Sequence, residues 1–233
     1  MNQPELDLPG TAVRVLPDHD ALAAEIVRRI LDAAAAAISE RGAFRICLAG
    51  GSTPMRAYRV LADRAADWAA WHIYHGDERC LPPDDPERNS HAADAAWLSR
   101  VAVPREQVFT IAAERGPSAA ADAYEPLVAA ALPFDLVLLG IGEDGHTASL
   151  FPGHAVPDRR LVIPVHNAPK PPPERVSLTP RALCTCRALL ILASGAGKAA
   201  ALARWRDGEK LPVASVAAGA PSEVLLDRAA LPD

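Results

Sequence analysis

The stretch FDLVLLGIGEDGHTASLFPG, residues 134–153, joins an apolar run to a turn that is rich in glycine and charge. The apolar residues within Phe134–Leu139 fit a strand that is buried on both faces, which is typical of parallel sheets covered by helices. The run stops at a group of glycines, and Asp144 and His146 stand among them. A parallel strand ends at the edge of the sheet where α/β proteins bind ligands, so this stretch predicts a fold and a site together.

Short apolar runs alternate with helical segments along nearly the whole chain. Strands are expected at residues 11–16, 44–49, 71–76, 108–111, 134–140, 161–165, 175–179, 188–194 and 223–227. Helices are expected at residues 21–40, 54–65, 89–101, 118–132 and 197–205. Asp18 or Asp20 can cap the first helix, and Gly42 ends it. This alternation predicts an α/β fold, with a parallel or mixed sheet flanked by helices on both sides.

The chain shows no fixed-period repeat and no low-complexity linker. The proline cluster NAPKPPPERV, residues 167–176, is interpreted as a surface loop within the pattern. We therefore predict a single domain over residues 1–233.

Composition narrows the class of function. Half of the 233 residues are hydrophobic, which excludes a disordered chain. The formal net charge is −5, so there is no broad basic surface for nucleic acid, and an anionic ligand would need a local basic site.

The cysteines and the N-terminus indicate the compartment. The four cysteines include no C-x-x-C pair and no paired Cys/His zinc spacing, so reduced thiols and no metal are expected. The opening MNQPELDLPG has neither the basic nor the apolar region of a secretory signal. No apolar run approaches the roughly 20 residues of a membrane span. A cytoplasmic protein without a membrane partner is the expectation.

The segment LAGGSTP, residues 48–54, has the composition of a phosphate-binding turn. Gly50 and Gly51 let the backbone approach an oxyanion, Ser52 and Thr53 supply hydroxyl groups, and the next helix begins there. The segment matches neither the Walker A nor the dinucleotide-binding pattern. An ordinary strand–turn–helix in which Ser52 or Thr53 caps the helix is the alternative interpretation.

Two further polar clusters follow expected strands. In GDER, residues 76–79, Arg79 is suited to a phosphate, and Asp77 or Glu78 could hold sugar hydroxyls, although a solvated turn has the same composition. In SGAGKA, residues 194–199, Lys198 lies near a helix start, where an anion between the two would be favourable. A solvated lysine is the alternative there.

His146 is the candidate general base. A carboxylate two residues away, on Asp144, can orient the imidazole, and the surrounding glycines free backbone N–H groups for a developing oxyanion. The ionised Asp144 would raise the pKa of His146, whereas burial would lower it, and the sequence does not rank the two. A helix-capping histidine is the alternative.

These segments together resemble the 6-phosphogluconolactonases. The resemblance rests on LAGGSTP, GDERCLPPDDPERN, FDLVLLGIGEDGHTASLFPG, RVSLT and SGAGKA, in this order and spacing. It implies a three-layer, Rossmann-like, mostly parallel domain that hydrolyses 6-phospho-D-glucono-1,5-lactone to 6-phospho-D-gluconate in the oxidative pentose phosphate pathway. It also implies that no cofactor or metal is needed and that the partner is a small phosphosugar lactone.

The resemblance assigns a role to each site residue. His146 corresponds to the base for the attacking water, and Asp77 and Asp144 to acidic positions near the sugar. The phosphate would be bound by Arg79, Lys198 and the loop formed by Gly50, Gly51, Ser52 and Thr53. This chain departs from the common pattern at Arg88, which with Asn89 stands where Ser-Asn is frequent, and at Cys184, where Asn is frequent.

The related glucosamine-6-phosphate deaminases share the glycine loop and a D-G-H motif, so a deaminase or isomerase is an alternative. That branch carries a glutamate five residues beyond the motif histidine, and this chain has Phe151 there. The aromatic side chain cannot shuttle a proton, which favours the lactonase. A phosphosugar sensor without catalysis is a second alternative, and the oligomeric state, monomer or weak dimer, stays open.

Overall fold

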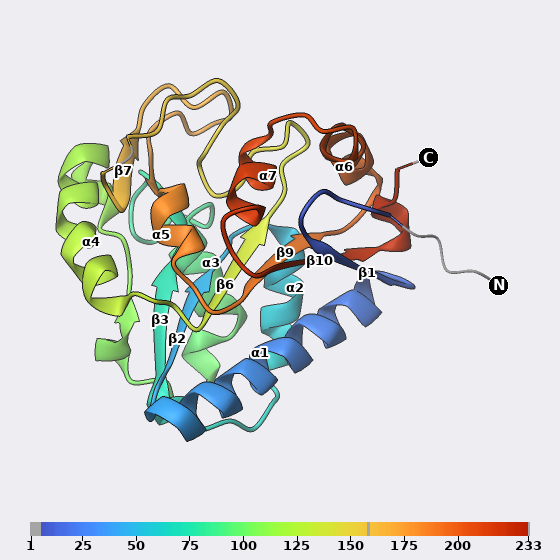
Figure 1. Cartoon of the computed structure of the whole chain (residues 1–233). Helices are drawn as coiled ribbons and strands as arrows, with labels where there is room; N and C mark the ends of the chain where they lie inside the picture. Colours follow the sequence, from blue (N-terminus) through green and yellow to red (C-terminus); the bar gives the residue numbers. More distant parts are fainter. Residues whose placement is uncertain (1–5, 158, 233) are drawn as a thin grey trace.

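A parallel sheet forms the centre of the molecule. The computed structural model describes residues 6–157 and 159–232, so the first half of MNQPELDLPG and the last residue of the predicted domain lie outside the described residues. Within the described part, seven strands form the sheet in the order β1-β10-β9-β6-β2-β3-β5, and all their pairings are parallel (Figure 1). The strands are β1 (Ala12–Leu16), β2 (Phe44–Leu48), β3 (Trp71–His75), β5 (Val108–Phe109), β6 (Leu136–Gly140), β9 (Leu189–Ala193) and β10 (Ser222–Asp227).

Helices cover both faces of this sheet. The helices are α1 (His19–Arg41), α2 (Ser52–Leu61), α3 (Asn89–Ala96), α4 (Pro117–Ala131), α5 (Pro180–Cys184), α6 (Ala199–Arg206) and α7 (Pro212–Ala217). One apolar cluster joins the sheet to α1, α2 and α3, and a second joins its other face to α4, α5, α6 and α7. The predicted three-layer α/β fold with a parallel sheet is confirmed.

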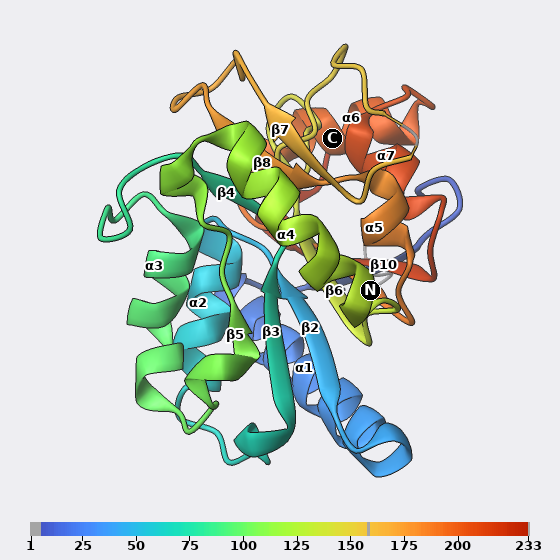
Figure 2. The same cartoon turned by 90° about the vertical axis from the view of Figure 1, so that its left-hand side faces the viewer.

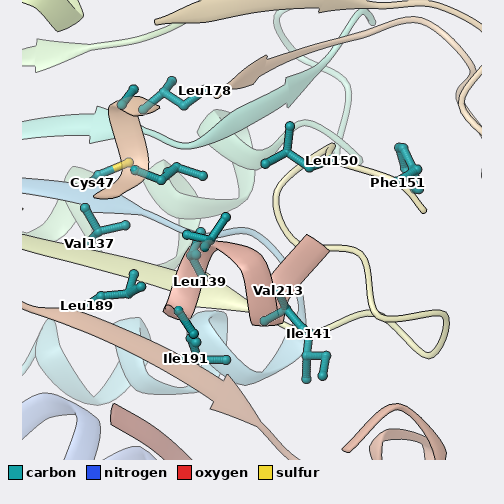
Figure 3. Close-up of a cluster of buried hydrophobic side chains, with 14 of the residues drawn as sticks. Cys47, Val137, Leu139, Ile141, Leu150, Phe151, Leu178, Leu189, Ile191 and Val213 are labelled. Atoms are coloured by element: carbon teal, nitrogen blue, oxygen red, sulfur yellow. The ribbon is translucent and has the colours of Figure 1, made fainter. Parts of the chain in front are cut away.

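Strand β6 shows why an apolar run without alternation predicted burial on both faces. Leu136 and Leu138 belong to the cluster beneath α1–α3, whereas Val137 and Leu139 belong to the opposite one. Because successive side chains of a strand point to opposite faces, both sets must be apolar. Figure 3 shows Val137 and Leu139 beside residues of β9, to which they are paired.

A second, smaller sheet departs from the predicted pattern. Strands β4 (Asp77–Arg79), β8 (Arg175–Leu178) and β7 (Val162–Val165) pair in antiparallel fashion, in that order. Figure 2 shows them together at the top of the molecule, next to α4. The runs at 161–165 and 175–179 were correctly expected as strands, but they form a separate sheet with GDER. Strand β4 is short and is held by its hydrogen-bonded pairing with β8, so its residues need no alternation of apolar and polar side chains. The sequence therefore did not reveal β4.

Helix boundaries differ from expectation at two places. Helix α2 ends at Leu61, not near residue 65, because Leu61 is its last fully buried residue and the chain then turns at the surface. Helix α3 ends at Ala96 because Trp97 leaves helical geometry and is fully buried among other aromatic rings. At α1, the carboxylate of Asp18 accepts the capping hydrogen bonds, which settles the choice between Asp18 and Asp20.

The strand order determines where the polar clusters lie. Strands β3, β2, β6 and β9 are consecutive neighbours, and each is followed by one of the four polar clusters. Since all four strands are parallel, all four clusters lie at the same edge of the sheet. The chain leaves β2 toward one side of the sheet and β6 toward the other, so the centre of the site is a topological switch point.

The central strand supplies a stability test that leaves the site untouched. Leu138 is fully buried on the face opposite the second cluster, so Leu138→Ala should lower the free energy of unfolding by about 2–5 kcal/mol. Leu127→Ala is the matched control, because Leu127 is 40% exposed and its loss should change stability by about 0.5 kcal/mol or less. Urea unfolding of both variants measures the difference, and equal effects would contradict the packing described for β6.

Candidate active site

The four clusters meet in one cleft of about 200 Å³ at the carboxyl edge of the sheet. Of the predicted site residues, the cleft is lined by Gly50, Gly51, Asp77, Arg79, His146 and Lys198. Asp144 lies directly behind His146, to which it is hydrogen-bonded. The cleft is also lined by residues that the sequence did not single out as ligand-binding, among them Asn89, Glu143, Lys170 and Arg175.

The turn after β6 holds an imidazole against a carboxylate. Asp144 Oδ1 lies 2.5 Å from His146 Nδ1 and also accepts a hydrogen bond of 3.2 Å from the His146 backbone N–H. The carbonyl of His146 accepts a 2.8 Å bond from Gly142 N, which closes the turn. A Cβ at Gly142 would stand 2.0 Å from His146 Nδ1. Glycine is therefore required at 142, and His146 Nε2 is left for the cleft.

Burial decides the ionisation of His146. Burial lowers the pKa of His146 below its ordinary value, the hydrogen bond and charge of Asp144 oppose that shift, and the charge of Lys170 adds to it. The pKa of Asp144 is also lowered: burial, the largest single effect, opposes the shift, but the hydrogen bonds and charge of His146 together with the charge of Lys170 outweigh it. At neutral pH the pair is a neutral imidazole beside a carboxylate, the state in which histidine accepts a proton.

The loop after β2 brings backbone close to the cleft. Gly50 packs so tightly that a Cβ there would lie 2.0 Å from Asn89 Oδ1. Helix α2 begins at Ser52, and the residue before it, Gly51, has no side chain that could accept a hydrogen bond from the first backbone N–H groups of the helix. Ser52 and Thr53 do not face the cleft; they line a separate hollow. Gly50 and Gly51 therefore line the cleft without the two hydroxyl groups beside them, and a role of Ser52 and Thr53 in binding the phosphate stays a prediction.

The acidic residues after β3 have different surroundings. Asp77 lines the cleft and accepts hydrogen bonds from Asn89 Nδ2 (2.9 Å) and Ser149 Oγ (2.7 Å). Glu78 is fully buried and accepts from the backbone N–H groups of Asn89 (2.7 Å) and Ser90 (2.8 Å). Glu78 therefore caps the start of α3, so of the two candidates for sugar hydroxyls only Asp77 faces the cleft.

The positions that depart from the family pattern have structural partners. Arg88 is buried and bonds to Glu114 (2.8 Å) and to the carbonyl of Ile111 (2.6 Å). Cys184 Sγ lies 3.3 Å from the carbonyl of Val216, outside the residues that line the cleft. Arg88 thus supports the segment that carries Asn89, and Cys184 joins α5 to α7.

The proline cluster, interpreted as a surface loop, is also a wall of the site. Lys170 lies within it and Arg175 begins the strand that follows, and both line the cleft. Arg175 is 4% exposed, and its guanidinium lies 5.6 Å from the centre of the Phe151 ring. The Phe151 ring in turn lies 4.8 Å from that of His146. The sequence feature that could have indicated their role is a pair of basic residues on either side of three consecutive prolines, because prolines stiffen a loop and fix the positions of such side chains.

Among the described residues, no group of three or more His, Cys, Asp or Glu side chains is arranged to hold a metal ion. The four cysteines are free thiols. Residues 6–157 and 159–232 also contain no helix with both the length and the apolar character to cross a membrane.

The pKa of His146 can be tested without any substrate. In an NMR titration the imidazole should protonate below about 6.5, because burial opposes its charge. Asp144→Asn should move the midpoint lower still, since the carboxylate raises this pKa. A His146→Gln variant identifies the resonance. A midpoint above the ordinary value in the unmodified protein would contradict the described surroundings.

Comparison with known proteins agrees with this geometry. A family model described as "Glucosamine-6-phosphate isomerases/6-phosphogluconolactonase" matches residues 17–225. The 6-phosphogluconolactonase of Mycobacterium tuberculosis is 40% identical over 227 residues, covering 91% of this chain and 92% of that protein. That of Streptomyces coelicolor is 39% identical over 234 residues, covering 91% and 88%. The structure of 6-phosphogluconolactonase from Thermotoga maritima superposes with a TM-score of 0.86 at 29% identity, over 93% of this chain and 99% of that one. The chain belongs to the glucosamine-6-phosphate isomerase/6-phosphogluconolactonase family.

Proposed function

We propose that this protein hydrolyses 6-phospho-D-glucono-1,5-lactone to 6-phospho-D-gluconate, the lactonase step of the oxidative pentose phosphate pathway. The observation that carries the proposal is the neutral His146 held by Asp144 in a cleft that is also lined by Arg79 and Lys198. Relatives that cover most of this chain carry the name of this enzyme. The substrate offers one ester carbonyl and one phosphate, which match the base and the two cations.

The base would act on water. His146 Nε2 takes a proton from a water molecule as its oxygen bonds to the lactone carbonyl carbon, and the carbonyl π electrons move onto oxygen. The oxyanion then re-forms the carbonyl and breaks the bond to the ring oxygen, which takes the proton back from the imidazolium. The products are a hydroxyl group and a carboxylic acid that ionises in solution. Because a lactone is an activated ester, this route needs no covalent nucleophile.

The phosphate would lie away from the reacting carbonyl. Arg79, Lys198 and the backbone at Gly50 and Gly51 line the cleft on both sides of the His146 turn. Binding energy from this distant group orients the carbonyl toward the base and contributes to turnover. Asp77, fixed by Asn89 and Ser149, can accept a hydrogen bond from a sugar hydroxyl.

The deaminase alternative is disfavoured by Phe151. A monomeric glucosamine-6-phosphate deaminase has the same fold, with a TM-score of 0.83 at 22% identity. In this chain the position that would supply a carboxylate carries an aromatic ring packed against His146. A ring there can exclude water from the imidazole but cannot move a proton during the ring opening of an amino sugar.

Acid release from freshly made 6-phosphogluconolactone, corrected for spontaneous hydrolysis, tests the proposal. His146→Ala should lower the enzymatic rate on the order of 10² to 10⁴-fold, as expected for loss of a general base. His91→Ala, which lines a different hollow, is the matched control and should keep full activity.

Two results would contradict the proposal. Tight lactone binding without turnover by the unmodified protein would favour a sensor. Ammonia release from glucosamine 6-phosphate, with no acid release from the lactone, would favour a deaminase.

A further inference from the structure

The loop that carries Lys170 is fastened to one side chain. Arg175 Nε donates to the carbonyl of Pro172 at 2.9 Å, and Nη2 donates to those of Pro171 (2.9 Å) and Lys170 (3.1 Å). Three consecutive carbonyls are thus held by a single guanidinium that is almost fully buried. A buried cation needs such partners, and a rigid guanidinium loses little freedom in making them. The position of Lys170 therefore depends on Arg175.

The same guanidinium is fixed relative to the base. It lies 5.6 Å from the centre of the Phe151 ring, which also packs against the ring of His146 at 4.8 Å between centres. Pairing of Arg175 with Arg79 across β8 and β4 holds its backbone in the small sheet. His146, Phe151, Arg175 and the Lys170 loop consequently form one packed series of contacts along the wall of the cleft.

The charge of Lys170 acts at the reacting end of the cleft. Lys170 lines the same cleft as His146, on the loop that Arg175 holds. In agreement with this placement, its charge lowers the pKa of both Asp144 and His146. Arg79 and Lys198, at the ends of other elements, are assigned to the phosphate. A third cation beside the base is best matched to negative charge that develops on the carbonyl oxygen.

We propose that Lys170 stabilises the oxyanion formed when water attacks the lactone, and that Arg175 is the residue that positions Lys170 for this task. This inference rests on the proposed lactonase activity. The ammonium donates a hydrogen bond to the oxyanion and keeps its proton throughout. When the carbonyl re-forms and the ring C–O bond breaks, the negative charge leaves the oxygen and the contact weakens. Lys170 would therefore favour the transition state over the bound substrate.

The test compares Lys170→Met with Lys198→Met on two substrates, 6-phosphogluconolactone and unphosphorylated glucono-1,5-lactone. Lys170→Met should lower kcat on the order of 10² to 10³-fold with both lactones, as for the loss of one oxyanion donor. Lys198→Met should raise KM roughly tenfold or more with the phosphorylated lactone, and it should affect the unphosphorylated lactone much less than Lys170→Met does. A rise in KM for the phosphorylated lactone alone in Lys170→Met would overturn the inference, as would activity within threefold of the unmodified enzyme.

The pH profile separates a charge effect from structural damage. The charged groups that act on the imidazole are Asp144, Lys170 and Asp77, with Arg175 behind the Phe151 ring. Arg204 donates to the carbonyl of Asp144, and the same cleft is lined by Glu143, Arg79 and Lys198. Lys170 lowers the pKa of His146, so Lys170→Met should move the acid limb of kcat/KM to higher pH. Arg175→Gln should show the same direction of shift and the same loss of kcat, with no further loss in the double variant. If the losses of kcat in the double variant were additive, the positioning role of Arg175 would be overturned. If the acid limb did not move in Lys170→Met, the charge role of Lys170 would be overturned.

The two proposals fail in different ways. If the unmodified protein hydrolyses neither lactone, the proposed function is wrong. If it hydrolyses them and Lys170→Met does so equally well, only the inference about Lys170 is wrong. Thermal unfolding of each variant identifies any loss of fold. Lys170→Met decides the role of Lys170 in either case, and Arg175→Lys, which keeps the positive charge, replaces Arg175→Gln as the test of positioning if Arg175→Gln does not fold.

Discussion

The hydrogen bond between Asp144 and His146 depends on a turn in which Gly142 has no side chain. A Cβ at that position would overlap the imidazole, so the backbone of the turn and the orientation of the ring are set together. The turn is rigid because it continues from β6, which is buried on both faces, and because Gly145 accepts a hydrogen bond from Val213 at the start of α7. Figure 3 shows Ile141, the first residue after β6, next to Val213. The central strand and the helix above it hold the base in place before any ligand arrives, which reduces the reorganisation needed for reaction.

The pKa of His146 results from opposing effects of its immediate surroundings. Burial favours the neutral imidazole, the carboxylate of Asp144 favours the protonated one, and Lys170 opposes protonation. The net result is a base that is free to accept a proton at neutral pH yet has a partner for the imidazolium that forms. Phe151 contributes to the burial of His146 and at the same time contacts Arg175, so one ring links the base to the wall that carries Lys170.

The parts of the fold that follow from local pattern could be predicted. The apolar run in β6 indicated burial on both faces, and the glycine, carboxylate and histidine after it indicated a site at the strand end. Parallel strands place such segments at one edge, so residues as distant as Gly50 and Lys198 could be expected together. The surroundings that depend on tertiary contacts could not. Glu78 and Asp77 are adjacent in sequence, but one caps α3 and the other faces the cleft. Lys170 and Arg175 entered the site because β8 pairs with β4, a contact that no periodicity revealed.

The central claim is that His146, held by Asp144, is the base for lactone hydrolysis. Its most direct test compares the pH dependence of kcat/KM for unphosphorylated gluconolactone with the NMR titration of His146 in the free enzyme, since kcat/KM reports ionisations of the free enzyme. The unphosphorylated substrate removes the phosphate ionisation near about 6 from the profile. The account predicts an acid limb with a single ionisation that coincides with the His146 midpoint, and Asp144→Asn should move both to lower pH together. An acid limb whose pKa differs from that of His146, or that stays in place when the His146 midpoint moves, would contradict it.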